Sequence, residues 1–190
     1  MREAHLSLAF HIPGIHHEDT GALDVASIIL GQGDSSRLTV GVKRQRQVVT
    51  DAYAYSYTPR DPGLMVAGAT LPPDRIEPAL DAIAEEVFRF RADLITGEEL
   101  NKAQAIIESD AIFQKETVQG QARKLGFFET VAGGLDYEDE YNRQVRAVTP
   151  EALRDTVRRY LTVENSTITL LVPEEQVGQI AALERKLAGT

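Results

Sequence analysis

Histidine and carboxylate side chains gather near the start of the chain, where they could bind a metal ion. His16, His17, Glu18 and Asp19 follow one another without interruption. Imidazole nitrogens and carboxylate oxygens are common zinc ligands, but adjacent residues do not easily converge on one ion. The run lies between Gly14 and an expected helix start, so a solvated turn with a helix cap explains it. We therefore predict no metal site here.

The other histidines do not extend this cluster into a catalytic site. His5 and His11 share one face of an expected strand, but they stand about 20 Å apart at roughly 3.3 Å per residue. All four histidines precede Ala22, which leaves the rest of the chain without a histidine base. The chain has no cysteine, so thiolate ligands, cysteine nucleophiles and disulfides are excluded. We assign no catalytic residue and no metal ligand.

Three further segments have the composition of binding sites. Residues 31–38 hold two glycines and two serines, but they lack the lysine of a phosphate-binding loop and the second glycine of a nucleophile elbow. The end of one helix and the cap of the next account for them. Residues 43–46 are basic and could contact phosphate or an acidic peptide, although a solvated helix face is the simpler interpretation. Tyr53, Tyr55 and Tyr57 could form a stacking platform or pack across strands.

Alternating hydrophobicity predicts the strands that position these residues. One strand has apolar side chains at every second position, at Leu6, Leu8, Phe10 and Ile12. Residues 49–57 alternate in the same way, and residues 64–71 form the returning strand of a hairpin after a turn over 58–63. Residues 168–172 predict the last strand.

Helices are expected between these strands. Asp19 or Thr20 can cap a first helix that Gly31 would end, and Ser35 or Ser36 can start a shorter one. Residues 76–90 have the spacing of an amphipathic helix.

A longer helical region follows. Thr96 and Glu99 form a capping box at its start. We expect Gly120 and Gly126 to interrupt it, and residues 133–134 to end it. Two short helices come next, over 136–145 and from Pro150.

The predicted fold is α+β, with an antiparallel or mixed sheet and helices packed on one face. Residues 1–173 form one domain, and residues 174–190 form a helical tail or a linker to a further domain. The net charge of −9 argues against a nucleic-acid surface. No apolar run approaches the roughly 20 residues of a membrane helix. The compartment stays open, because a chain without cysteine suits cytosol and periplasm equally.

Several short segments follow one another in an order and spacing shared with a known family. They are LSLAF at 6–10, ILGQG at 29–33, SSRL at 35–38, DPGL at 61–64, TGEELNKA at 96–103 and VTPE at 148–151. Together they resemble the second domain of a half-unit in the insulinase and mitochondrial processing peptidase family. The likeness covers about residues 4–173 and implies a zinc metallopeptidase.

In that family the zinc ligands come from an inverted H-x-x-E-H motif and a distant glutamate. This chain contains no H-x-x-E-H. The resemblance therefore implies that zinc is bound by another domain, that this domain holds no cofactor of its own, and that it is inactive by itself.

The resemblance also implies two positions that could line a substrate site. The substrate-binding half of the family has an arginine followed, seven residues on, by a tyrosine. The corresponding positions are Lys43 and Thr50. Lysine keeps the charge but not the fork of a guanidinium, and threonine lacks the reach of a phenol. This domain therefore fits better beside the zinc-bearing half, or in a structural role.

Two hypotheses of different classes follow. In the first, the domain forms part of the wall of a substrate chamber, lined by the strand face opposite Leu6, Leu8 and Phe10 and by residues 43–51. Its partners are then a zinc-bearing domain, in the same chain or in a partner subunit, and a peptide substrate. In the second, the domain belongs to a non-catalytic assembly subunit like the scaffold proteins that the family contributes to respiratory complexes. A stand-alone small-molecule binding domain is a third, weaker possibility.

Overall fold

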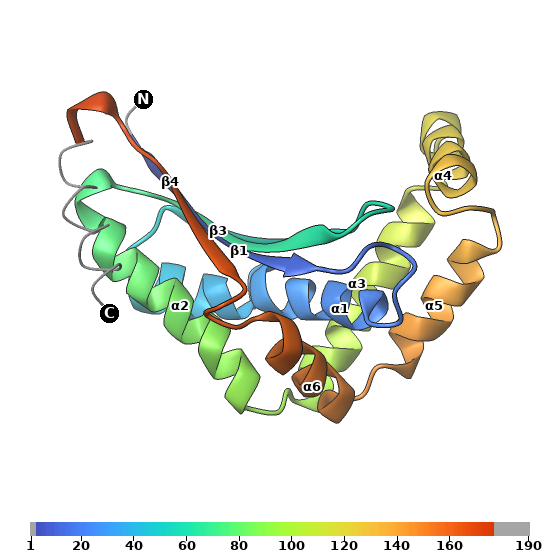
Figure 1. Cartoon of the computed structure of the whole chain (residues 1–190), viewed down its shortest axis with the longest axis horizontal. Coiled ribbons are helices and arrows are strands. Elements are labelled where there is room, and N and C mark those ends of the chain that lie inside the picture. The colour runs from blue at the N-terminus through green and yellow to red at the C-terminus, as the bar shows by residue number, and fades with distance from the viewer. Residues whose placement is uncertain (1–2, 177–190) are drawn as a thin grey trace.

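The computed structural model describes residues 3–176 as an antiparallel sheet with helices on one side (Figure 1). The strands are β1 (Ala4–Ile12), β2 (Asp51–Tyr57), β3 (Gly63–Leu71) and β4 (Ser166–Leu171). Their order across the sheet is β2-β3-β1-β4, and every neighbouring pair is antiparallel. The predicted α+β fold is confirmed, and the sheet is antiparallel rather than mixed among these residues.

Helices follow the predicted order along the chain. Their bounds are α1 (Thr20–Gly31), α2 (Ile76–Ala92), α3 (Gly97–Phe113), α4 (Val118–Thr130), α5 (Tyr137–Ala147) and α6 (Pro150–Tyr160). A π-helix, η1 (Thr39–Gln45), lies between α1 and β2, and single 3-10 turns occur at η2 (Pro73–Arg75) and η3 (Glu174–Gln176). Residues 177–190, the greater part of the predicted tail, lie outside the described residues.

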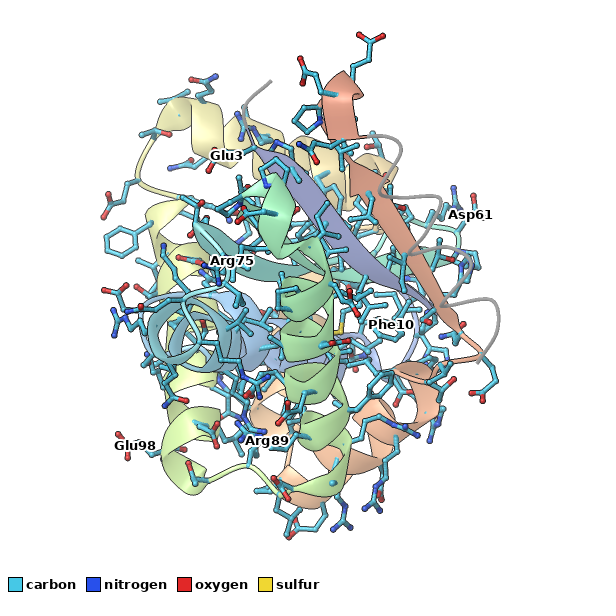
Figure 2. All side chains as sticks on the ribbon, turned by 90° about the vertical axis from the view of Figure 1, so that its left-hand side faces the viewer. Glu3, Phe10, Asp61, Arg75, Arg89 and Glu98 are labelled. Carbon is cyan, nitrogen blue, oxygen red and sulfur yellow. The ribbon has the colours of Figure 1, made fainter. Side chains whose placement is uncertain are left out.

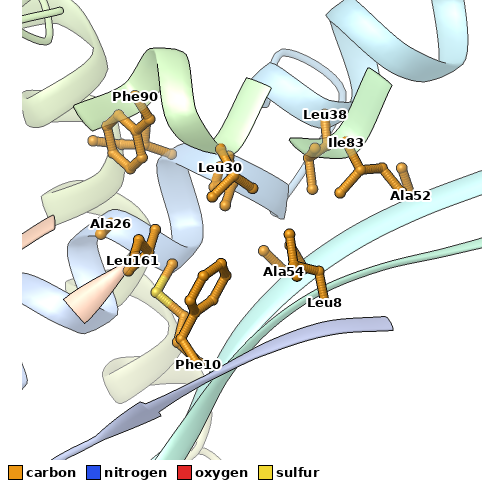
Figure 3. Close-up of a cluster of buried hydrophobic side chains, with 14 of the residues drawn as sticks. Leu8, Phe10, Ala26, Leu30, Leu38, Ala52, Ala54, Ile83, Phe90 and Leu161 are labelled. Carbon is orange, nitrogen blue, oxygen red and sulfur yellow. The ribbon is translucent and has the colours of Figure 1, made fainter. Parts of the chain in front are cut away.

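The core fills the space between the inner face of the sheet and the helices. Every second residue of β1, from Ala4 to Ile12, is buried, because strand side chains alternate between the two faces. Phe10 points from β1 toward Leu30 on α1 and Phe90 on α2, as Figure 3 shows. Each of these three side chains is almost fully buried. This single core holds α1 and α2 against the sheet.

Two helices begin where the sequence predicts and for the expected reasons. Thr96 accepts a hydrogen bond from the Glu99 backbone while the Glu99 carboxylate accepts one from the Thr96 backbone, which completes the capping box of α3. Thr149 caps α6 in the same way through the Ala152 N–H. Arg75 and Arg89 mark the two ends of α2 (Figure 2).

The glycines follow the predictions only in part. Gly31 is the last residue of α1, as predicted, but it is not left-handed; the positive φ of +82° belongs to Gly33. A Cβ on Gly31 would stand 1.8 Å from the Ala54 backbone nitrogen, so glycine is needed there because β2 packs directly on α1.

Gly120 and Gly126 do not interrupt a helix, because both lie inside α4. The helical region breaks earlier, between Gln114 and Thr117, where the Thr117 side chain caps α4 through the Gly120 N–H. The predicted turn at Gly133 and Gly134 is present, with φ values of +81° and +153°. In the described part of the chain, no helix has the length and hydrophobicity to cross a membrane.

Candidate functional site

Within residues 3–176, the helices leave one face of the sheet uncovered (Figure 1). Helices α1, α2 and α6 lie against the inner face, whereas α4 projects past one end of the sheet (Figure 1). We call the other side the open face. On β1, β2 and β3 it carries His5, Ser7, Ala9, His11, Asp51, Tyr53, Tyr55, Tyr57, Leu64, Val66, Gly68 and Thr70, and on β4 it carries Thr167, Thr169 and Leu171. This is the strand face opposite Leu6, Leu8 and Phe10 that the sequence analysis proposed as a chamber lining.

The tyrosines of β2 form an aromatic row along the open face. Tyr53 pairs with Gly68 across the sheet, and its ring covers the glycine so closely that a Cβ there would meet it at 2.5 Å. Tyr55 stacks beside Tyr53, with ring centroids 6.1 Å apart. Tyr55 and Tyr57 are 49% and 62% exposed. Tyr53 therefore packs across strands, as one interpretation predicted, and the outer two rings face solvent. Whether they form a stacking platform stays a prediction.

Lys43 and Thr50 lie at one corner of this face. The Lys43 ammonium is 2.8 Å from the carboxylate of Asp51, the first residue of β2. Thr50 precedes that residue, and its hydroxyl donates a hydrogen bond of 2.8 Å to Glu3. Both residues therefore adjoin Asp51, Lys43 through its ion pair and Thr50 through its place in the chain. Both are accessible, and whether they contact a substrate stays a prediction.

The π-helix η1 presents Lys43 at this corner. Insertions of this kind are frequent at functional sites. Its Gly41 lies under the Glu86 carboxylate, which is buried and bonded to Arg89 at 2.7 Å. A Cβ on Gly41 would meet a Glu86 oxygen at 2.5 Å. The remaining basic residues of η1 and its end point outward, where Arg44 pairs with Asp34 and Arg46 with Glu85.

The histidine run does not form a metal site. His17 accepts a hydrogen bond from the Asp19 backbone, and the His16 ring packs edge-on against Tyr137. The Asp19 carboxylate lies 3.6 Å from the His17 ring nitrogen and also bonds to α6, and it makes no side-chain cap bond to α1. Within residues 3–176, no group of three or more histidine, aspartate or glutamate side chains is arranged to hold a metal ion.

The structure also contains a cavity that the sequence analysis missed. It has a volume of about 520 Å³ and lies between α1, α3, α4 and α5. Asp24 of α1 lines it and accepts a hydrogen bond of 2.7 Å from the Tyr141 hydroxyl. Burial raises the pKa of Asp24 to about 6, although the Tyr141 and Ser56 hydroxyls favour the ionised form. The sequence signal that could have indicated this cavity is an acidic residue, Asp24, among the apolar residues of α1.

Comparison with known families identifies the domain. Residues 1–107 match the model of the peptidase M16 inactive domain. The chain belongs to the peptidase M16 family. The predicted membership in a family of zinc metallopeptidases is thereby confirmed, as is the match to a domain that does not carry the catalytic centre.

Bacterial relatives of this M16 domain are named as zinc proteases. It is 24% identical over 171 residues to the protein of Bacillus subtilis named uncharacterized zinc protease YmxG, covering 90% of this chain and 42% of that protein. It is 25% identical over 170 residues to zinc protease PqqE of Helicobacter pylori, with 88% and 38% covered. The chain thus spans about two fifths of the length of these relatives.

Solved structures of the family share the fold. A protease from Helicobacter pylori superposes with a TM-score of 0.83 at 22% identity, over 91% of this chain and 42% of that one. A peptidase M16 inactive domain from Pseudomonas fluorescens gives 0.79 at 19%, over 90% and 41%. A chain of complex III2 from Candida albicans gives 0.78 at 15%, over 90% and 43%. One fold therefore occurs both in a protease and in a chain of complex III2.

Proposed function

We propose that this M16 domain forms part of the wall of a substrate chamber in a zinc metalloendopeptidase. A zinc-bearing domain, in the remainder of the same polypeptide or in a partner subunit, carries out peptide hydrolysis. The observation that carries the proposal is the open face, an accessible sheet surface with exposed tyrosines beside an ion pair.

The chemistry of the open face suits an extended peptide. Exposed aromatic rings supply apolar contact area at a low cost in side-chain entropy, and their hydroxyls supply hydrogen bonds. Tyr55 and Tyr57 offer both, while the small side chains of Ser7 and Ala9 on β1 leave room beside them. Lys43 and Asp51 at the corner add groups that can bind peptide termini or charged side chains.

The division of labour follows from the metal chemistry. Zinc hydrolases use three protein ligands and one open position for water or substrate. The described residues of this domain provide no such ligand group. Its role in catalysis is then to hold the peptide, which raises the rate by positioning the scissile bond.

A peptide-binding titration tests this proposal. The probe is a blocked ten-residue peptide without charged side chains, added to the isotopically labelled 190-residue chain and followed by amide NMR. We expect shifts confined to the open face, and a several-fold weaker affinity in Tyr55→Ser. The matched control is Phe113→Ser, which removes an aromatic side chain of 60% exposure from α3. Equal effects of the two variants, or no shifts on the sheet, would contradict the proposal.

Metal analysis tests the assignment of zinc to another domain. We expect near-zero zinc by atomic emission after dialysis of the purified chain against trace metal, and no cleavage of a fluorogenic peptide. About one zinc per chain, lost on replacement of His16 or His17, would overturn this assignment.

The alternative is an inactive structural or assembly subunit of the same family. The likeness in fold to a chain of complex III2 supports this alternative. Such a subunit would need no peptide surface, so it would show no peptide-induced shifts on the open face. The same titration therefore separates the two functions.

A further inference from the structure

The 520 Å³ cavity between the helices has an acidic base and aromatic walls. Asp24 lies on α1, and the rings that enclose the space belong to Phe127 and Phe128 on α4 and to Tyr137 and Tyr141 on α5. Phe128 and Tyr137 are 5.9 Å apart between ring centroids, and Tyr137 stacks on Tyr141 at 6.1 Å. Its volume is within the range of small-molecule sites, roughly 300 to 1,000 Å³.

The Asp24 carboxylate lacks a cation. Among residues 3–176, no basic side chain forms an ion pair with it, and its hydrogen-bond partner at 2.7 Å is the neutral Tyr141 hydroxyl. The tyrosine hydroxyls are already committed, since Tyr137 donates to the Ile15 carbonyl over 2.9 Å. An ionised carboxylate in such a place is stabilised by an opposite charge brought in by a ligand.

Four other charged residues line the cavity, two acidic and two basic, so their charges cancel. Lys124 and Lys115 each lie 2.7 Å from Glu138 and share its carboxylate, and the Lys124 ammonium also lies 5.5 Å from the centroid of the Phe128 ring. Arg123 and Asp110 are both exposed and carry opposite charges. Asp24 remains as a part-buried carboxylate without a counterion among the described residues, in a chain whose net charge of −9 attracts cations.

We propose that this cavity binds a monocation with an apolar stem, whose ammonium or guanidinium group reaches Asp24 between the rings of Phe128, Tyr137 and Tyr141. The aromatic faces contact the stem and attract the positive charge through their quadrupoles. The carboxylate fixes the charged end by a charge-assisted hydrogen bond. The ligand is a free amine or the basic side chain of a peptide, which share this chemistry.

The site is separate from the open face, because helices and loops form it rather than the outer side of the strands. It does not depend on the chamber proposal. If a cation binds in the cavity and no peptide binds to the open face, the cavity proposal holds and the chamber proposal fails. If a peptide binds to the open face and no cation binds in the cavity, only the chamber proposal holds.

Titration of the purified chain with two probe pairs tests the proposal. Phenethylamine is compared with 2-phenylethanol, and acetyl-arginine amide with acetyl-norleucine amide, by amide NMR at pH 7.5. We expect each cation that binds to do so at least about tenfold more tightly than its neutral partner. Tighter binding of phenethylamine would support a free amine, and tighter binding of acetyl-arginine amide would support a peptide side chain.

Variants and pH then decide the role of Asp24. Asp24→Asn keeps the shape but removes the charge, and we expect it to abolish the preference for the cation. Asp81→Asn on the exposed side of α2 is the matched control and should leave binding unchanged. At pH 5, about one unit below the pKa of Asp24, the affinity should fall about tenfold. Three results would overturn the proposal. They are equal affinity for neutral and cationic probes, a folded Asp24→Asn variant that keeps the preference for the cation, and no binding of either cation.

Discussion

The hydroxyl of Tyr160 donates a hydrogen bond of 2.8 Å to the carboxylate of Asp19, a residue 141 positions earlier in the chain. Arg159 reaches the same carboxylate at 2.6 Å, so the last turn of α6 is tied to the start of α1. The side chain of Asp19 is only 12% exposed. A residue that the sequence suggests as a helix cap thus joins two helices.

Replacing Asp19 by alanine should lower the free energy of unfolding by about 1 to 3 kcal/mol, because its part-buried carboxylate and the hydrogen bonds it accepts from Thr156, Arg159 and Tyr160 are lost. Asp136→Ala is the matched control, since Asp136 precedes α5 without a side-chain cap bond and is exposed. Its effect should stay within about 0.5 kcal/mol. Urea denaturation of both variants measures the difference, and equal losses would contradict the assigned role of Asp19.

A methyl group at Gly31 should destabilise the protein severely. The new Cβ would meet the Ala54 nitrogen at 1.8 Å, and relief requires α1 and β2 to move apart. We expect Gly31→Ala to cost at least about 3 kcal/mol or to prevent folding. Gly126→Ala within α4 meets no atom within 4 Å and should be neutral or stabilise by up to about 1 kcal/mol. Thermal unfolding followed by circular dichroism distinguishes them, and a near-neutral Gly31→Ala would refute the close approach.

Asp24 should make the protein less stable as the pH rises. Its pKa is raised from 3.8 to about 6, so the folded state binds a proton that the unfolded state has lost between these values. The free energy of unfolding therefore falls as the pH rises from about 4 to 6. The total loss across this range is on the order of 2 to 3 kcal/mol. Asp24→Asn should remove this part of the pH dependence. Denaturation midpoints from pH 4 to 7 test it, and parallel curves for wild type and variant would show that the pKa is not raised.

Glu99 should make the protein more stable as the pH rises, the opposite of the effect of Asp24. Burial alone would raise its pKa, but hydrogen bonds from Arg37 and Thr96, with the Arg37 charge, hold the pKa below 4.5. Its contribution to stability is present above the unfolded pKa and is lost as the pH falls through the lower folded value. We expect Glu99→Gln to be less stable than wild type at pH 7 and to lose less stability on acidification.

The exposed neighbour Glu98 provides the control for that experiment. Glu98→Gln removes the same charge from the same turn of α3 as Glu99→Gln does. The ion pair with Arg37 is kept, because Arg37 pairs with Glu99 at 2.8 Å. Its pH profile should follow the wild type. A profile for Glu98→Gln that matched Glu99→Gln would assign the effect to the helix terminus rather than to the ion pair.

The sequence predicted the elements of this domain because their causes are local. Alternation along β1, the capping box of Thr96 and Glu99, and Pro150 at the start of α6 each depend on neighbouring residues alone. The order of short segments also indicated the M16 family before any contact was known.

The tertiary structure decided what depends on distant residues. Gly31 was expected to end a helix, but only the packing of β2 against α1 shows that a side chain at this position has no room. Asp19 bonds to α6 rather than capping its own helix, which no local pattern could reveal. The Asp24 cavity requires α1, α4 and α5 to meet, and burial by those helices raises the pKa of its carboxyl group. Desolvation and steric contact depend on what folding brings together, whereas periodicity and capping are already present in the linear chain.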